Sequence, residues 1–491
     1  MADRYWVGGT GTWNPSSGSR WSNVSGGSGG YGVPGSADNA IFDGNSGGGT
    51  ITVSSGRICS NLVLTGFTGK FTGARTSSLT VYGSSIYLTG PSGQSMPGNG
   101  PYLVIGNASC TLYTNGSSIG DINIPSTSYA LTLGSDVASK NDTIINNYGT
   151  LNLNGYNLTV GYLFNQATLN MGSGTMQCIQ SGPLSGSQYC FYNNSNSGGT
   201  VNASTSTLRF IRARGSSGLR YAISSSATSI VLVDFYLDIN LTSWPTSGTI
   251  QIDNEIMSYS GTSGVTNSVT LTITGRGLYN TAPASHSAGA TVLLIGLQTT
   301  LTAAANSGDG TLTVADTTIF EGNGYLEVGG EMISYTGKTS TTFTGCSRGV
   351  TTYGGTSAAY HTSGTTVRWA ERRVIYFGIS TYNIVEFATG GGYVMSDVYD
   401  SPTIGTVRAG PYLPANPLPM QYINFVNTPS ITNFYLNGQR GTQGTFSQPV
   451  YVSGRTGTNT STINYVSGYP TSPNMPYTYT GGDPGDFDSF M

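Results

Sequence analysis

Residues 149–161 have the sequence G-T-L-N-L-N-G-Y-N-L-T-V-G. Leucine or valine alternates with asparagine or threonine, and glycines and asparagines interrupt the runs. Alternation with a period of two places the apolar side chains on one face of a β-strand, and turn-forming residues end each strand. The stretch therefore predicts short strands that follow one another closely and bury one face.

The same pattern fills residues 35–225, and it returns from 370 to 465. Apolar residues do not recur at helical spacing over three turns in 35–225, so we expect an all-β protein with very little helix. Asparagines on successive turns favour a β-solenoid with stacked amides. A β-sandwich gives the same alternation, so the sequence leaves both architectures open for the body.

Composition indicates a folded chain with a neutral surface. The 491 residues are 37% hydrophobic and only 8% charged, and they include 72 glycines and 32 tyrosines. A chain of this length is expected to form several domains. With 19 basic and 22 acidic residues and no run of either, the chain lacks the basic patch of a nucleic-acid-binding protein.

Targeting and cysteine patterns add two expectations. The start, Met-Ala-Asp-Arg-Tyr-Trp, resembles no secretory signal, and no apolar run approaches the roughly 20 residues that span a bilayer. The five cysteines have no metal-ligand spacing, so we expect buried free thiols. Cys178 and Cys190 are the one pair close enough in sequence to consider as a disulfide.

Residues 248–294 and 324–367 repeat one pattern with different spacer lengths. The repeat predicts two tandem β-modules of about six strands each, at 226–296 and 297–369. The aligned polar and aromatic residues include the two histidines of the chain. The aligned pairs are Glu255 with Glu331, Tyr259 with Tyr335, Arg276 with Arg348 and His286 with His361.

These repeated residues have a structural and a catalytic interpretation. Carboxylate, guanidinium and imidazole groups can serve in acid-base chemistry. We favour the structural interpretation, in which a bidentate Glu–Arg pair closes a loop onto a strand while tyrosine and histidine fill the space above it. Glutamate and tyrosine stand four apart on one strand and therefore share a face.

A second catalytic hypothesis is glycan cleavage by two carboxylates. The acidic residues that could form such a pair are Asp397, Asp400, Glu386, Asp234 and Asp238. Asp253, Asp309 and Asp316 lie in turns that could hold calcium, but their spacing is not that of a calcium loop. The chain contains no phosphate-binding loop and no nucleophile elbow, so we expect no catalytic residues, no metal and no cofactor.

The ends of the chain differ from its body. Residues 1–34 carry Trp6, Trp13 and Trp21 on a glycine-rich backbone, which predicts an attachment or capping segment that packs on the body or on another protein. Prolines between 401 and 419 predict an irregular surface excursion or an edge crossing, since proline cannot donate to a strand ladder. Residues 466–491 are expected to be an extended tail.

Two parts of the chain resemble proteins of tailed phages. The opening R-Y-W-V-G-G-T-G-T-W-N and the later V-P-G-S-A-D-N-A-I-F-D resemble the N-terminal part of virion proteins, notably from marine and cyanobacterial phages. The repeat with Glu-x-x-x-Tyr, Arg-Gly and His-x-x-Gly is similar to one found in phage tail and fibre-like proteins. The resemblance covers residues 1–65 and 226–369, and it implies a particle component without catalytic residues. The chain lacks the coiled-coil or collagen-like shaft of a long fibre.

The sequence thus predicts a structural protein on the exterior of a phage virion, made in the host cytoplasm. A homotrimeric tail fibre or spike that contributes to host attachment is the first hypothesis, with a capsid decoration protein and a glycan depolymerase tailspike as alternatives. The expected partners are other virion proteins, further copies of the chain and a host cell-surface glycan, without nucleic acid or membrane insertion. The expected domains are 1–34, 35–225, 226–296, 297–369, 370–465 and 466–491.

Overall fold

The computed structural model describes residues 2–454, apart from residues 15, 17, 75, 90–100, 115–118, 139–143, 181–189, 213–215, 234–243, 254, 266–267, 279–281, 296–297, 319, 321, 351–356, 389–392, 413–420, 426–428 and 439–449. The protein is all-β and multi-domain, with 52% of its residues in strands and no helix of seven residues or more. Three short 3-10 turns, η1 (Gly18–Arg20), η2 (Gly44–Ser46) and η3 (Ser195–Ser197), are the helical elements of the described residues.

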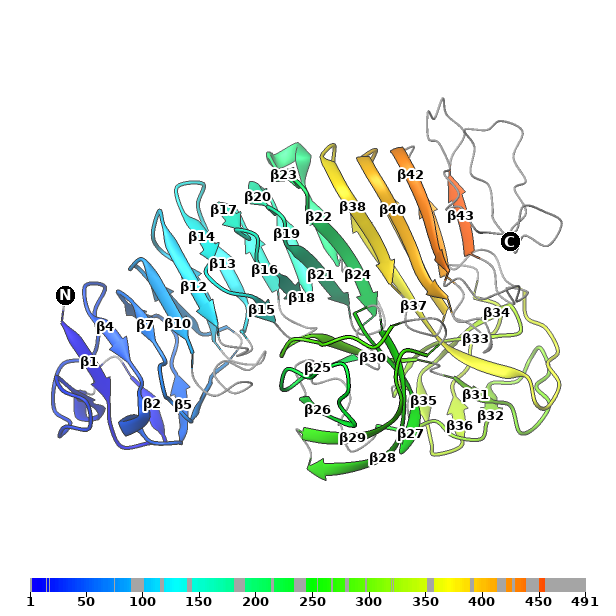
Figure 1. The fold of residues 1–491 in the computed structure, drawn as a ribbon, viewed down its shortest axis with the longest axis horizontal. Coiled ribbons are helices and arrows are strands. Elements are labelled where there is room, and N and C mark those ends of the chain that lie inside the picture. The colour runs from blue at the N-terminus through cyan, green and yellow to red at the C-terminus, as the bar shows by residue number, and fades with distance from the viewer. Residues whose placement is uncertain are drawn as a thin grey trace.

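The body is a parallel β-solenoid, the first of the two architectures that the sequence left open (Figure 1). One coil shows the plan: β17 (Thr150–Asn152), β18 (Leu158–Val160) and β19 (Tyr162–Asn165) pair in parallel with β20 (Thr168–Asn170), β21 (Thr175–Gln180) and β22 (Phe191–Asn193) of the next coil. These two coils therefore contribute one strand each to three rows, which we call faces A, B and C.

The other solenoid strands extend these rows. Face A comprises β4 (Asn39–Ile41), β7 (Leu62–Val63), β10 (Ser85–Leu88), β12 (Cys110–Thr114), β14 (Ala130–Leu133), β17, β20 and β23 (Thr200–Asn202). Face B comprises β15 (Val137–Ala138), β18, β21, β24 (Thr207–Arg212), β38 (Thr381–Ala388), β40 (Thr403–Tyr412) and β42 (Ser430–Gly438). Face C comprises β6 (Arg57–Cys59), β9 (Ser78–Val81), β11 (Tyr102–Ile105), β13 (Ile122–Ile124), β16 (Ile144–Asn147), β19, β22, β37 (Thr366–Tyr376), β39 (Tyr393–Tyr399), β41 (Gln421–Phe425) and β43 (Val450–Gly454).

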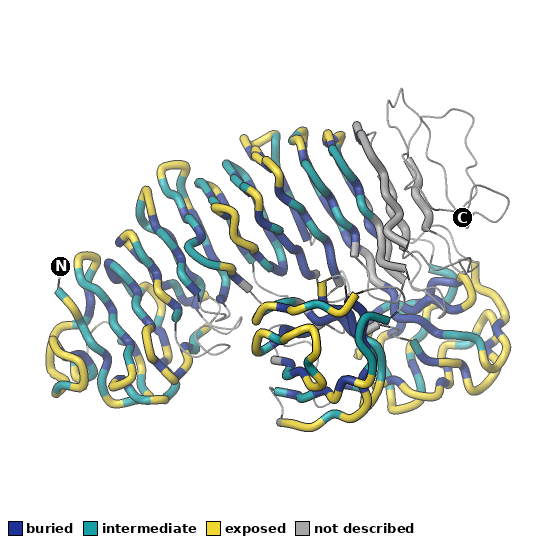
Figure 2. Tube along the Cα trace, in the orientation of Figure 1, coloured by how far each residue is buried: buried dark blue, intermediate teal, exposed yellow. Residues whose placement is uncertain are grey.

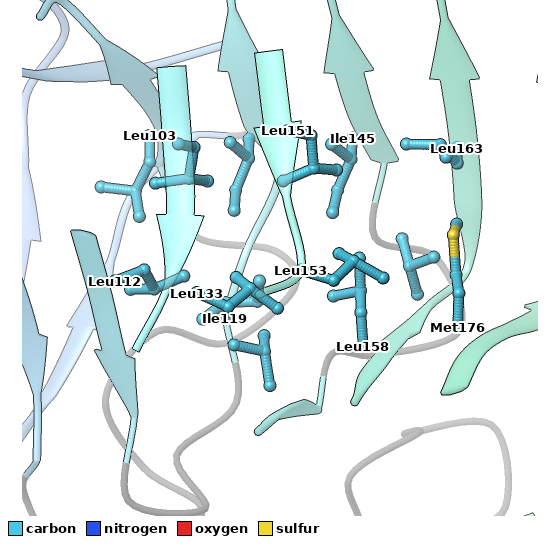
Figure 3. Packing of buried hydrophobic residues seen from close by; sticks show 14 of the residues in the cluster. Leu103, Leu112, Ile119, Leu133, Ile145, Leu151, Leu153, Leu158, Leu163 and Met176 are labelled. Atoms are coloured by element: carbon cyan, nitrogen blue, oxygen red, sulfur yellow. The ribbon is translucent and has the colours of Figure 1, made fainter. Parts of the chain in front are cut away.

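The register stacks like residues from coil to coil. Leu131, Leu151, Leu169 and Val201 are successive partners on face A, and their side chains are buried inside the solenoid. Buried residues recur along the body in Figure 2, and Figure 3 shows the apolar side chains that pack inside one part of it. These side chains belong to one hydrophobic cluster that extends from Trp6 to Ile431. Burying each leucine contributes on the order of 2 kcal/mol, so the short strands hold together through this stack.

Asparagines form two ladders, as the sequence predicts for a solenoid. On the outside of face A, Asn202 donates to Asn170, and Asn170 donates to Asn152, both at 2.6 Å. A second ladder lies inside the solenoid, where Asn147 donates to Asn165 and Asn165 to Asn193, both at 2.7 Å. Each amide satisfies the next, so these polar groups can be buried without loss of hydrogen bonding.

The three N-terminal tryptophans lie inside the first coils. Strand β1 (Asp3–Trp6) pairs antiparallel with β3 (Trp21–Ser22) and parallel with β4, while β2 (Gly11–Trp13), β5 (Thr50–Val53) and β8 (Lys70–Thr72) form a small sheet beside them. Trp6, Trp13 and Trp21 are 0% exposed and pack around Phe42. Residues 1–34 therefore belong to the solenoid as its cap. Because the rings are buried in its core, they are not accessible for the predicted attachment contact with another protein.

The duplicated module interrupts one coil of the solenoid. Strand β24 precedes the insertion and β37 follows it, yet β24 pairs with β38 and β22 pairs with β37. The coils before and after the insertion therefore form one body. The first module is a closed barrel of β25 (Ser216–Leu219), β26 (Ser229–Val233), β27 (Ser247–Ile252), β28 (Glu255–Val265), β29 (Ser268–Gly275) and β30 (Thr291–Ile295).

The second module repeats part of the strand pairing of the first, and we call it the second barrel although its strands belong to two separate sheets and do not form one closed ring of pairings. Its strands are β31 (Gln298–Thr300), β32 (Thr311–Thr313), β33 (Gly324–Val328), β34 (Glu331–Tyr335), β35 (Gly337–Lys338), β36 (Thr342–Thr344) and the first half of β37. β33 pairs with β34 and β37 as β27 pairs with β28 and β30. The second half of β37 belongs to face C, so one strand joins module and solenoid.

Two boundaries differ from the expectation. The first barrel begins at β25, before the expected boundary at 226, because β25 pairs with both β26 and β30. The segment expected to be irregular, 401–419, contains strand β40, in which Ile404 and Val407 are buried. Pro411 lies where the register with β42 shifts, so the ladder tolerates its missing N–H. Residues 413–420 and the expected tail, 466–491, lie outside the described residues.

Candidate functional site

The repeated polar residues of the first barrel converge on one buried carboxylate. Arg276 donates from Nε and Nη2 to the two oxygens of Glu255, at 2.6 and 2.7 Å. The backbone N–H groups of Gly277 and Ala284 donate to the same oxygens at 3.0 and 2.9 Å, and Nε2 of His286 lies 2.9 Å from Oε2. Glu255 is 1% exposed, so five donors replace the water that its charge has lost.

The second barrel builds the same cluster around Glu331. Arg348 donates from Nε and Nη2 at 2.8 and 2.7 Å, and the N–H groups of Gly349 and Ala359 donate at 2.8 and 3.1 Å. Nε2 of His361 lies 2.7 Å from Oε2 of Glu331. The structure thus brings together glutamate, arginine and histidine of each copy, although up to 31 positions separate them in sequence.

The guanidinium groups also hold backbone carbonyls. Arg276 donates to the carbonyls of Ser224, Ala227 and Ala284 at 3.1, 3.2 and 2.7 Å. Arg348 donates to those of Asn306 and Ala359. The clusters therefore use their donors and acceptors to join segments of each barrel, as a structural role requires.

The electrostatics agree with a carboxylate that is ionised near neutral pH. Burial alone would raise the pKa of Glu255, but the hydrogen bonds from Arg276, Ala284, His286 and Gly277 outweigh it and lower the pKa to about 2. The corresponding donors lower the pKa of Glu331 as well, against the effect of burial. A carboxyl group held in this way is a poor general acid near neutral pH.

The tyrosines lie elsewhere than expected. Tyr259 is 2% exposed, and its hydroxyl donates to the carbonyl of Pro245 at 3.0 Å. Tyr335 is equally buried and packs against Phe343, with ring centroids 4.7 Å apart. Each tyrosine ring covers a glycine, Gly248 or Gly324, where an added Cβ would approach the hydroxyl to 3.1 or 3.3 Å. The tyrosines fill the barrel core, and it is the histidines that bind the carboxylates.

The two clusters differ at one position that the sequence comparison passed over. Asp253 precedes Glu255 by two residues, and Gly329 precedes Glu331 by two. Oδ2 of Asp253 lies 2.7 Å from Nδ1 of His286. Burial alone would lower the pKa of His286, but its bonds to Asp253 and Glu255 reverse this and raise it. Aligning the two copies places Asp253 opposite Gly329, so this difference can be found from the sequence alone.

The other acidic candidates serve local contacts where they are described. Glu386 accepts from Arg209 at 3.1 Å, and its register partner on the opposite side is Arg408. Asp400 accepts from the N–H of Gly378 at 2.8 Å. Asp234, Asp238 and the side chain of Asp397 lie outside the described residues.

The turn aspartates considered for calcium also have protein partners. Asp309 accepts from the N–H of Asn306 at 2.7 Å, Asp316 accepts from Thr318 at 2.9 Å, and Asp253 binds His286. Within the described part of the chain, His, Cys, Asp and Glu side chains form no group of three or more that could hold a metal ion. The search for long apolar helices likewise finds no candidate membrane span in that part.

The five cysteines are free thiols, four of them buried. Cys178 and Cys190, the pair considered for a disulfide, are not bonded to each other. Burial raises the pKa of Cys110 to about 12 and that of Cys346 to about 11. Thiols with such pKa values are unreactive at neutral pH.

Comparison of the chain with protein-family models, with curated proteins and with solved structures gives no significant match.

Proposed function

We propose that the protein is a structural component of a tailed-phage virion, a tail fibre or spike-type appendage that contributes to attachment to the host surface. The observation that carries the proposal is the architecture: a capped solenoid whose coils pair continuously across the insertion, with two β-modules on its side (Figure 1). A rigid rod with side modules holds binding surfaces at a distance from the particle. The resemblance of the N-terminal and repeat motifs to phage virion proteins supports the same proposal.

The chemistry of the clusters supports a structural role over glycan cleavage. Glycan hydrolysis needs two carboxyl groups with different proton affinities beside an open groove. Glu255 and Glu331 are buried and bound by arginine, and Glu386 lies in a row between two arginines. These three carboxylates thus hold strands and loops together.

Homotrimerisation belongs to the same proposal. A cyclic assembly brings identical surfaces of the subunits together around one axis, where like charges would repel each other. The outside of face C carries a ladder of uncharged rings, in which Phe164, Tyr192, Tyr376 and Tyr399 follow one another at centroid distances of 4.7, 5.2 and 4.6 Å. On face B, by contrast, Arg209, Glu386 and Arg408 form a charged row.

Two measurements test the proposal. Antibodies against the purified chain, coupled to gold and applied to particles, should label the tail or its appendages, and light scattering of the purified chain should give the mass of three copies. Label over the capsid would favour the decoration protein instead. Shortening of host polysaccharide by the purified chain would favour the depolymerase.

A further inference from the structure

The buried cluster of each barrel fastens both ends of the connection between its arginine and its histidine, which we call the loop. In the first barrel, Glu255 accepts from the N–H groups of Gly277 and Ala284, which begin and end the loop 277–284. In the second barrel, Glu331 does the same for the longer loop 349–359. One carboxylate thus sets the distance between the loop ends. Loop length can therefore change between the copies without changing the barrel, since closure costs grow slowly with length.

The second cluster also fixes the backbone on both sides of Tyr360. Before it, Ala359 donates its N–H to Glu331 and accepts from Arg348. After it, His361 binds Glu331 through its ring, and its N–H donates to the carbonyl of Ala305 at 2.9 Å. The side chain of Tyr360 is nevertheless 60% exposed. The tyrosine ring is therefore exposed on a backbone segment whose conformation is already restricted by hydrogen bonds on both sides.

The surroundings of Tyr360 are polar and include one carboxylate, that of Asp309, which accepts from the N–H and from the side-chain amide of Asn306 at 2.7 and 3.3 Å. Asn306 and Ser357 are exposed, and Arg348 binds the carbonyls of both Asn306 and Ala359, which brings these two segments together. The side chain of Arg348 is 5% exposed and its guanidinium is committed to Glu331, so it offers no charge to an acidic ligand. Tyrosine with small amide and hydroxyl groups is the composition of adaptable recognition surfaces.

The first barrel offers a matched position without the ring. Ser285 lies between Ala284 and His286, which Glu255 holds as Glu331 holds Ala359 and His361. Its exposed side chain therefore takes the place of the tyrosine. The same scaffold thus carries a different residue in each copy.

We propose that this end of the second barrel binds an uncharged sugar residue of a surface glycan, with Tyr360 as the stacking platform and Asn306 and Ser357 as hydrogen-bonding groups. The flat ring takes the C–H face of a pyranose, and the amide and hydroxyl groups bind its hydroxyls. The fixed backbone reduces the entropy lost on binding. The inference rests on the proposed attachment function and gives that function a site and a ligand class.

The test uses the full chain, fluorescently labelled, and the cells that its particle infects. Tyr360→Ala should weaken binding about tenfold or more, which is the loss of roughly one stacking contact, while Tyr360→Phe should retain most of the binding. Tyr148→Ala, which removes a 39% exposed tyrosine from the solenoid, is the matched control and should bind as the unchanged chain does. Adding Ser285→Tyr to Tyr360→Ala should restore binding in part.

The outcomes separate the site from the function. Periodate treatment of the cells, which cleaves sugar diols, should abolish binding, and protease treatment should leave it intact; the reverse result would overturn the glycan class. Unchanged binding by a folded Tyr360→Ala chain would overturn the site and leave the attachment function standing. If the unchanged chain does not bind these cells, the attachment function fails and the site fails with it. Circular dichroism and thermal unfolding establish that each variant is folded.

Discussion

Oδ2 of Asp253 lies 2.7 Å from Nδ1 of His286, whereas the corresponding residue of the second barrel, Gly329, has no side chain to offer His361. Both residues adopt positive φ, 50° for Asp253 and 55° for Gly329, so the turn has the same left-handed backbone in each copy. His286 therefore has a carboxylate at each ring nitrogen. Only the protonated imidazole can donate to both.

The first prediction concerns the pH dependence of the first barrel. A histidine whose pKa is raised by folding adds stability that is fully present below its unfolded value of about 6.5 and is lost as pH rises through the folded value. Asp253→Gly, which installs the residue of the second barrel, should lower the pKa of His286, as measured by nuclear magnetic resonance titration of its ring. Asp309→Asn removes a turn carboxylate of the other barrel and should leave this titration in place. An unchanged midpoint in Asp253→Gly would contradict the interpretation.

The second prediction concerns the buried carboxylate of the second barrel. Glu331→Gln leaves the guanidinium of Arg348 buried without its charge partner, which should cost roughly 3–5 kcal/mol in the free energy of unfolding. Amide hydrogen exchange should show lost protection at Gly349 and Ala359, whose N–H groups donate to this carboxylate.

The control for this variant is an ion pair of the solenoid that is more exposed. In the pair of Arg209 with Glu386 the side chains are 25% and 14% exposed. Glu386→Gln should therefore cost about 1 kcal/mol or less. Equal losses of unfolding free energy in Glu331→Gln and Glu386→Gln would show that the hydrogen bonds that Glu331 accepts from the loop add no stability beyond that of a more exposed ion pair.

The third prediction compares the two asparagine ladders. Asn165 is 0% exposed, and its amide donates to Asn193, Ala167 and Thr200 while it accepts from Asn147. Asn165→Ala should cost about 1–3 kcal/mol for each partner left buried and unpaired. Asn170→Ala in the outer ladder should cost well under half as much, because water can reach the groups it leaves. Denaturant unfolding of both variants measures the difference, and similar values would argue against a special role for the inner ladder.

The sequence predicted the strands of the solenoid because apolar residues alternate along each strand with a period of two, and every second side chain of a strand faces the buried interior. Leu151 and Asn152 alternate along the strand, and the parallel register places each beside its like in the next coil. The insertion was harder to place, since no local signal says that β24 and β38 are neighbours across 177 positions. That pairing depends on the whole stack of coils.

The sequence predicted which side chains belong to the candidate cluster but not how they are arranged. The repeat identified Glu255, Arg276 and His286, but the backbone amides of Gly277 and Ala284 carry no side-chain signal in a sequence. The place of the tryptophans was not fixed either, because the glycine-rich segment around Trp13 allows both a cap and an attachment arm. Their burial depends on contacts with Phe42, which directly follows strand β4 and lies later in the chain.

The last prediction concerns this cap. Trp21 packs edge to face against Trp6 and Phe42, with ring centroids 5.4 and 5.5 Å away, and it closes the first coil together with β1. Trp21→Ala should cost about 3–5 kcal/mol through the cavity it leaves. The loss should appear first as proteolysis near the N-terminus, because unpairing of β3 exposes the edge of β1 to proteases and to other chains. Val24→Ala, at a position that is 55% exposed in the same segment, should cost less than about 0.5 kcal/mol. If Trp21→Ala leaves both the unfolding midpoint and the N-terminal cleavage unchanged, the tryptophan cluster does not hold the cap in place.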